Sequence, residues 1–318
     1  MKFRLLAIIL TMLASTSGAR AQAKYPPETK NAAVVYWAAF AEMQGEPWEL
    51  TKETLPDETV WNETKFGPIL DANAQAIRTM RQATNLPECD WGPEDSQGPR
   101  AKVVYLPQAR ALARLNALEG KRQMAKGDSQ AAVNTWLAGI RFSQDVTRGE
   151  PVINVLVAKQ LLLPNLRALT EESHKGQWNE EQKKQVYAAV RALPEDGLDW
   201  RGAWGAEYAR GEQILQKLRT ATNPRATYKA LAGTPAPKHG VPPTVLEIQR
   251  FGEYMLAVQA ALHGSPAEAE TLLDDLEPKR RTLGEIEQNL IPNPQKLNAA
   301  RTEVVTARAE LMRALAPQ

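Results

Sequence analysis

The sequence is poor in the residues that hold most metals and disulfides: it has one cysteine and three histidines among 318 residues. A single cysteine, Cys89, cannot form an internal disulfide, which excludes a disulfide-stabilised scaffold. His174, His239 and His263 stand far apart, and neither a His-Glu-x-x-His motif nor a cysteine pair occurs. The spacings typical of zinc sites are therefore missing. We predict no metal site and no cofactor.

Motifs of the common catalytic classes are also missing. No Gly-x-Ser-x-Gly sequence marks a nucleophile elbow, and Gly120-Lys121 is followed by Arg122 where a phosphate-binding loop needs Ser or Thr. Triads whose members meet only in space are invisible in a sequence, and so are paired carboxylates. We predict no catalytic residue. A hydrolase with spatially assembled carboxylates is the last of three functional alternatives.

A strong charge of either sign is absent as well. Lys and Arg number 39 against 37 Asp and Glu, a net charge of +2. Residues 1–21 hold three bases and no acid, which leaves 36 bases against 37 acids in the rest of the chain. A nearly neutral chain lacks the extended positive field that holds a polyanion, so we predict no nucleic-acid partner.

The first twenty-one residues have the three parts of a secretory signal peptide. Lys2 and Arg4 form a positive start, and Leu5–Ala14 is an apolar core that is too short to span a bilayer. Ala19-Arg20-Ala21 supplies the small-x-small cleavage pattern. We predict cleavage after Ala21 and a periplasmic or secreted protein. No transmembrane segment is expected after cleavage, because charge and proline interrupt the next apolar run, 152–158.

The remaining chain shows apolar residues at helical spacings of three and four almost throughout. We predict an all-α fold, an array of antiparallel helical hairpins of tetratricopeptide-like or irregular α-solenoid type, with almost no sheet. Lys102–Leu106 is the one candidate strand. Residues 22–194 would form an N-terminal helical region with a Pro/Gly loop near 85–100, and residues 195–318 a C-terminal helical region with a Pro-rich linker near 233–243. The helices are expected at 31–43, 57–83 with a break at Gly67-Pro68, 107–126, 128–148, 151–173, 179–193, 195–222, 244–263, from 266 until Pro278 breaks or kinks the helix, and 295–316.

Two features of this pattern concern how the helices pack. The last helix has an apolar seam from Leu297 to Ala314, which we expect to pair with the seam of residues 276–290. Gly120, Ala132 and Trp136 match the small, small and large positions of a tetratricopeptide hairpin. A second, weaker match lies at 256–273. Generic antiparallel packing of helices is the alternative.

Several segments together resemble a family of exported bacterial helical proteins that has no assigned activity. They are Asn31-Ala32-Ala33, the Leu86–Gly92 run, the arginine-rich helix Leu106–Lys126, and the Gly149–Ile153 start of the next helix. The resemblance covers roughly residues 31–170. It implies an exported, largely helical protein with tetratricopeptide-like packing, and it carries over no catalytic residue.

Two groups of side chains are candidates for binding. Trp200, Trp204 and Tyr208 recur every four residues and share one helix face, which is either a face for a ligand or partner or, the alternative we favour, a core stripe. A basic series lies on one helix and is either its solvated face, which we favour, or a site for an anion. This series is Arg110, Arg114, Lys121, Arg122 and Lys126.

These observations favour an exported interaction or scaffold protein of the cell envelope, with another envelope protein or a peptide as partner. Helical arrays bury a continuous core and leave a face free for a partner. The alternative is a small-ligand or glycan-binding protein that uses the aromatic face. The pattern does not indicate an oligomeric state.

Overall fold

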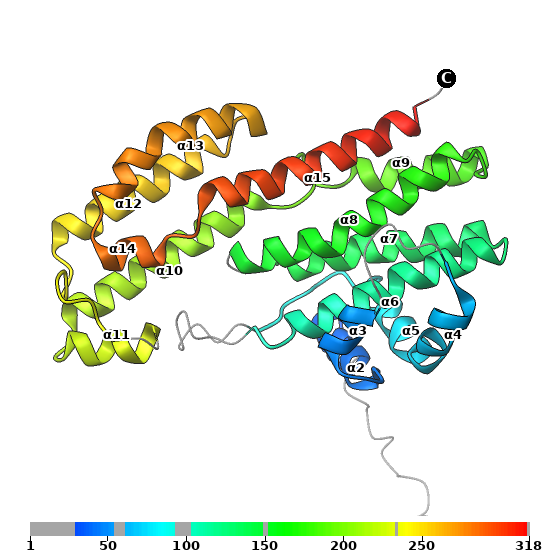
Figure 1. The fold of residues 1–318 in the computed structure, drawn as a ribbon, viewed down its shortest axis with the longest axis horizontal. Helices are drawn as coiled ribbons and strands as arrows, with labels where there is room; N and C mark the ends of the chain where they lie inside the picture. The colour runs from blue at the N-terminus through cyan, green and yellow to red at the C-terminus, as the bar shows by residue number, and fades with distance from the viewer. Residues whose placement is uncertain (1–28, 54–60, 93–102, 149–151, 233–234, 317–318) are drawn as a thin grey trace, which may run out of the picture. The chain divides into compact units, whose positions relative to one another are not determined.

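Helices make up about 75% of the part of the chain that the structure describes, and this part holds no strand. The computed structural model describes residues 29–53, 61–92, 103–148, 152–232 and 235–316. The prediction of an all-α fold is confirmed. The helices, shown in Figure 1, are α2 (Ala32–Glu42), α3 (Pro47–Glu53), α4 (Glu63–Ala72), α5 (Ala74–Ala83), α6 (Leu106–Ala125), α7 (Ser129–Val146), α8 (Val152–His174), α9 (Glu180–Arg191), α10 (Trp200–Thr220), α11 (Pro224–Ala232), α12 (Val245–Ala261), α13 (Pro266–Arg281), α14 (Glu285–Leu290) and α15 (Pro294–Ala314).

Most helices begin where a capping side chain stands in the sequence. The Asp128 carboxylate accepts the backbone N–H of Ala131 at the start of α7, as predicted. Asn179 and Gln182 form a capping box at α9. Ser265 caps α13, with Pro266 in the first turn, where its missing N–H costs nothing. Local hydrogen bonds therefore fix these boundaries.

Two predicted boundaries are wrong, each for a local reason. The break in the second helical region lies at Asn73, not at Gly67-Pro68, because the buried Asn73 amide bonds the Gln44 backbone in both directions. The helix predicted over 195–222 is α10, and it begins at Trp200 rather than at 195. Gly197 adopts a left-handed turn before it, with φ +77°.

The candidate strand Lys102–Leu106 is also wrong within the described residues. Val104 and Tyr105 form a turn, with the Leu106 N–H donating to the Val103 carbonyl, and Leu106 is the first residue of α6. Pro107 favours the helix here, because its fixed φ suits a first helical turn and it has no N–H for a strand ladder. Pro278, by contrast, lies inside α13, which continues to Arg281.

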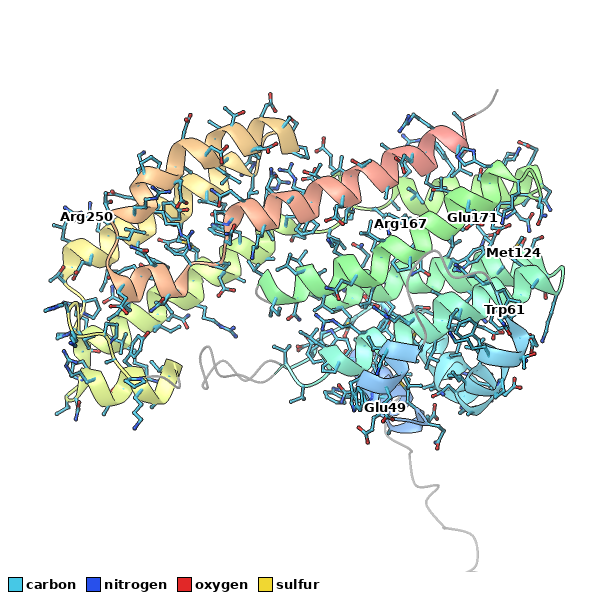
Figure 2. The ribbon with its side chains drawn as sticks, in the orientation of Figure 1. Glu49, Trp61, Met124, Arg167, Glu171 and Arg250 are labelled. Carbon is cyan, nitrogen blue, oxygen red and sulfur yellow. The ribbon has the colours of Figure 1, made fainter. Side chains whose placement is uncertain are left out.

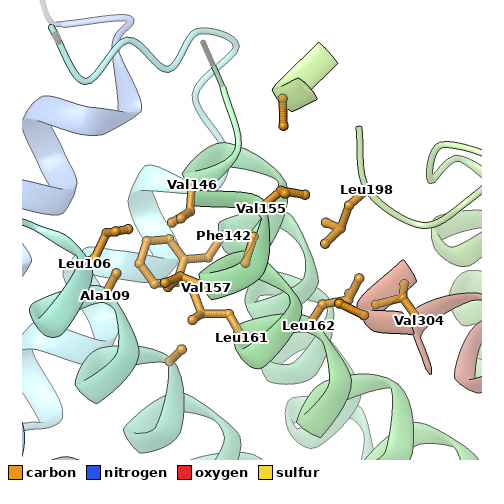
Figure 3. Close-up of a cluster of buried hydrophobic side chains, with 14 of the residues drawn as sticks. Leu106, Ala109, Phe142, Val146, Val155, Val157, Leu161, Leu162, Leu198 and Val304 are labelled. Carbon is orange, nitrogen blue, oxygen red and sulfur yellow. The ribbon is translucent and has the colours of Figure 1, made fainter. Parts of the chain in front are cut away.

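The helices α6, α7 and α8 pack in sequence order through close contacts at small residues. A Cβ atom added to Gly120 of α6 would lie 2.3 Å from Nε1 of Trp136 on α7, and one added to Gly139 of α7 would lie 2.4 Å from Oδ1 of Asn165 on α8. These distances are shorter than van der Waals contact, so only glycine permits the helices to approach this closely. Figure 3 shows the resulting core, in which Phe142 and Val146 of α7 lie beside Val155 of α8.

The C-terminal helix packs mainly on α8, with α13 as a second neighbour. The predicted seam is buried from Leu297 to Leu311, and its last member, Ala314, is half-buried. Its principal partner is not the expected 276–290 segment. Val304 lies near Leu162 of α8 in Figure 3. A single seam shows which residues are buried and not which helix covers them, which explains the difference.

By length and composition alone, α8 is one helix of the described chain that could cross a membrane. Of its most apolar window, 67% is buried among the other helices. The core helix of a folded domain passes the same test. The predicted signal peptide and residues 93–100 of the predicted Pro/Gly loop lie outside the described residues.

Candidate binding cleft

A cavity of about 540 Å³ opens between α5 and α7, with one residue of α9 at its edge. This volume is in the range of pockets that hold small ligands or a short stretch of a partner chain. Its lining contains three guanidinium groups, several carboxamides and no acidic side chain. The lining residues are Arg78, Arg81, Gln82, Thr84, Asn85, Asn134, Leu137, Ala138, Arg141 and Gln185.

The α5 wall carries Arg78 and Arg81, one helical turn apart. The opposite face of α5 is apolar and buried through Ile77 and Met80, and this packing turns the two arginines outward. Arg78 Nη2 donates to Gln75 Oε1 at 2.6 Å. Among the described residues, neither arginine forms an ion pair. The positive charge of this wall is therefore available to a ligand.

The α7 wall carries Arg141, which is held from behind by a buried carboxylate. Asp145, one turn further along α7, has no exposed surface, and its Oδ1 lies 3.3 Å from Nε of Arg141. The same Oδ1 lies 3.4 Å from Nε of Arg148. One carboxylate thus stands between two guanidinium groups, and the surroundings of Arg141 keep an excess of positive charge.

Asp145 also connects the cleft to the N-terminal helix. Its Oδ2 accepts the Tyr36 hydroxyl of α2 at 2.8 Å, and its backbone carbonyl accepts the Trp91 indole N–H at 2.8 Å. The Trp91 ring stacks on Tyr105, with 4.1 Å between centroids. Burial raises the pKa of Asp145, while the hydrogen bond from Tyr36 and the two arginines act to lower it. The carboxylate is fixed by this network of contacts.

Asn31 and the Leu86–Gly92 run, which are distant in sequence, meet at this network. Asn31 clamps the backbone of Asp90, donating to its carbonyl and accepting its N–H, each at 2.8 Å. The Cys89 thiol lies 3.6 Å from the Asp145 carbonyl, and burial raises the pKa of this thiol to about 12. A thiol with so high a pKa is unreactive near neutral pH, which agrees with a structural role for Cys89.

Amide side chains of α7 and α9 bond one another at the edge of the cleft. Gln185 of α9 donates to Oδ1 of Asn134 at 2.9 Å, and Gln130 donates to both of them, to Oε1 of Gln185 at 2.9 Å and to Oδ1 of Asn134 at 3.2 Å. Amides offer donors and acceptors together. Here the oxygens of Asn134 and Gln185 accept bonds from neighbouring amides, and the carboxamides of Gln82 and Asn85 also line the cleft.

The predicted aromatic face divides between the core and a second cavity. Trp200 and Trp204 are 1% and 0% exposed, and the Trp204 indole donates to the Met255 carbonyl at 2.9 Å. Both rings are core residues, the alternative that the sequence favoured. Tyr208 instead lines a cavity of about 380 Å³ between α10 and α12, together with the exposed Val245 and Leu256.

Two arginines of the basic series on α6 form contacts within the fold. Arg122 forms ion pairs with Glu63 at 2.7 Å and Asp71 at 2.6 Å, both on α4. Arg114 donates to the Thr51 carbonyl of α3 at 2.5 Å. These contacts hold α3 and α4 against α6. The expectation of a solvated face is therefore wrong for these two arginines.

The part of the chain that the structure describes has no group of three or more His, Cys, Asp or Glu residues that could hold a metal ion. Glu171, labelled near the end of α8 in Figure 2, forms an ion pair with Lys175 at 2.7 Å. Nδ1 of His263 lies 2.8 Å from Nη1 of Arg201, so this ring nitrogen faces a guanidinium group.

No family model, curated protein or solved structure matches this chain.

The cleft residues come from helices that are distant in sequence, which is why sequence reasoning missed them. The available signal was the pair Arg78 and Arg81 on the polar face of a strongly amphipathic helix.

Proposed function

We propose that the chain is an exported interaction protein of the cell envelope that binds a partner protein or peptide in the cleft between α5 and α7. The observation that carries this proposal is the lining of the cleft: three arginines converge there without an ion pair to balance Arg78 and Arg81. A cleft lined by charges of one sign concentrates oppositely charged groups, so this lining favours a ligand that carries negative charge.

The proposed architecture is an array of antiparallel helical hairpins with tetratricopeptide-like packing. Support comes from contacts between α6 and α7. Asn116 Nδ2 donates to the Thr135 carbonyl at 2.9 Å, and Trp136 Nε1 donates to the Ala117 carbonyl at 3.2 Å. Gly120 provides the close approach between these two helices. In such an array a cleft between non-consecutive helices, such as α5 and α7, is a suitable place for a partner.

Binding fits the chemistry of the cleft better than catalysis does. Guanidinium groups stay protonated at all ordinary pH values, and carboxamides do not titrate. The lining side chains can therefore hold and orient a ligand, but none of them is suited to accept or deliver a proton. An enzyme with spatially assembled carboxylates remains the last alternative.

Export is the part of the proposal that rests on residues 1–21. N-terminal sequencing of the protein isolated from the envelope or the medium should begin at Gln22. A chain that keeps Met1 and stays in the cytoplasm would contradict export without affecting the cleft.

Site-specific photocrosslinking in intact cells tests the binding role. A photoreactive residue at position 138, in the floor of the cleft, should trap a defined partner, and the yield should fall when Arg81→Gln is added. The matched control replaces Ala309, an exposed residue of α15. Equal trapping at 138 and 309, or none at 138, contradicts the proposal.

A ligand site at Tyr208 is the second candidate. The cavity between α10 and α12 has an aromatic ring and open aliphatic surface, which suits a small ligand or a glycan. Tyr208→Ala should then abolish binding of such a ligand and leave crosslinking at position 138 unchanged.

A further inference from the structure

We propose that the partner segment bound in the α5–α7 cleft is an acidic peptide, whose carboxylates pair with Arg81 and Arg141. This inference rests on the proposed function and names the chemistry of the partner. Three features of the cleft support it: the free edges of its guanidinium groups, its carboxamides, and the limited extent of its charge.

The first feature is the orientation of Arg141. Asp145 lies on the Nε side of this guanidinium, 3.3 Å away, so the two Nη nitrogens remain for a ligand. A pair of guanidinium nitrogens matches the two oxygens of a carboxylate in a bidentate pair. Asp145 is fully buried and held by Tyr36, so Arg141 is positioned before the ligand arrives.

The second feature is the charge on the opposite wall. Arg81 is half-buried and Arg78 is exposed, and their spacing of three residues places them side by side on α5. Burial raises the pKa of Glu119 of α6, and the charge of Arg81 is one of several that act to lower it, without an ion pair between the two. Two walls with guanidinium groups suit a ligand with more than one carboxylate.

The third feature is the set of carboxamides: Gln82, Asn85, Asn134 and Gln185. Each amide offers a donor and an acceptor, which is also what a peptide group offers. A phosphate anion is almost only an acceptor and offers no donor to the amide oxygens of Gln82 and Asn85, whereas the oxygens of Asn134 and Gln185 already accept amide N–H groups within the fold. Leu137 and Ala138 add an apolar floor for the methylene groups of Asp or Glu side chains. A peptide satisfies all of these groups together.

The near-neutral charge of the chain argues against a nucleic acid as the occupant. Outside residues 1–21 the acids slightly exceed the bases, so no extended basic surface would follow a phosphate backbone. The positive charge of the cleft is local and matches a short acidic segment.

Fluorescence anisotropy with the mature chain tests the inference. The probe is a fluorescein-labelled peptide of alternating Glu and Asp between glycines, and its matched control has Gln and Asn at the same positions. We expect the acidic peptide to bind, with an affinity that falls as ionic strength rises. The amide peptide should bind roughly tenfold more weakly or worse.

Variants locate the site. Arg81→Gln and Arg141→Gln should each weaken binding of the acidic peptide by roughly tenfold. Arg141→Lys keeps the positive charge but loses the paired guanidinium nitrogens that match a carboxylate, so it should also weaken binding. Arg281→Gln removes the same charge from α13, where the side chain is 77% exposed, and should leave the affinity unchanged. Because Arg81 has no ion pair within the described fold, Arg81→Gln should keep the wild-type melting temperature.

Three results would overturn the inference. The amide peptide could bind as tightly as the acidic peptide, or the folded Arg81→Gln variant could keep the wild-type affinity for the acidic peptide. The third is complete displacement of the acidic peptide by equimolar inorganic polyphosphate. If the acidic peptide does not bind but position 138 still traps a partner in cells, the acidic chemistry is wrong and the proposed function stands. If trapping at position 138 also fails, the proposed function is wrong as well.

Discussion

Replacing Gly120 by alanine should destabilise the protein, although alanine is the better helix former. Gly120 lies in the interior of α6, where Gly→Ala alone would stabilise the helix by about 1 kcal/mol. The new Cβ atom, however, would lie 2.3 Å from Nε1 and 2.5 Å from Cε2 of Trp136. To relieve this overlap, either α6 and α7 must move apart or the Trp136 indole must shift.

The indole has little room to move. Trp136 is 1% exposed, and its Nε1 donates to the Ala117 carbonyl at 3.2 Å. Overpacking a core of this kind costs about 1–3 kcal/mol, and loss of the hydrogen bond adds about 1 kcal/mol. After the gain in helix propensity, we expect a net loss of about 1–3 kcal/mol in the free energy of unfolding.

Gly205→Ala is the matched control. Gly205 also lies inside a helix, α10, but the nearest atom to an added Cβ is the mobile end of Gln259, at 3.3 Å. This variant should be as stable as the wild type or up to about 1 kcal/mol more stable. Urea denaturation followed by circular dichroism measures both. A Gly120→Ala protein at least as stable as the wild type would refute the close packing of α6 on α7.

Three further predictions concern stability. Leu311→Ala should cost about 2–5 kcal/mol in denaturant unfolding, because Leu311 is fully buried; no loss would mean that the end of α15 lies outside the core. Tyr36→Phe should cost about 1.5–3 kcal/mol, because the buried Asp145 loses a hydrogen bond; an unchanged unfolding midpoint would contradict this network. Burial raises the pKa of Glu287, so the folded state holds this proton more tightly than the unfolded state does. Stability should therefore fall as pH rises from about 4.3, the unfolded value, through the folded pKa. Glu287→Gln should flatten this part of the pH profile of unfolding, whereas the exposed neighbour Glu285→Gln should not; identical profiles for the two variants would contradict the assignment.

The helices and many of their ends were predictable from the sequence because local interactions determine them. Asp128 and Pro266 act within one turn of their own helix, so a single sequence shows their effect. The partner of α15 was not predictable. Its seam from Leu297 to Leu311 is compatible with any apolar helix face, and long-range packing selected α8.

The cleft was not predictable for the same reason. Arg78 and Arg141 each read as an ordinary basic residue on the polar side of an amphipathic helix, and only the packing of α5 near α7 brings them together. The opposite error occurred on α6. Arg122 looked like part of a solvated basic face, but Glu63 and Asp71 arrive from α4 to pair with it.

A double-mutant cycle between Arg141→Gln and a single Glu→Gln change in the acidic peptide tests the central claim most directly. The cycle separates direct contact from general charge, because it subtracts the effect of each change alone. If the cleft binds a carboxylate at Arg141, one peptide position should show a coupling free energy of about 1 kcal/mol or more, and the same cycle with Arg281→Gln should show none. Additive effects at every peptide position would contradict the account.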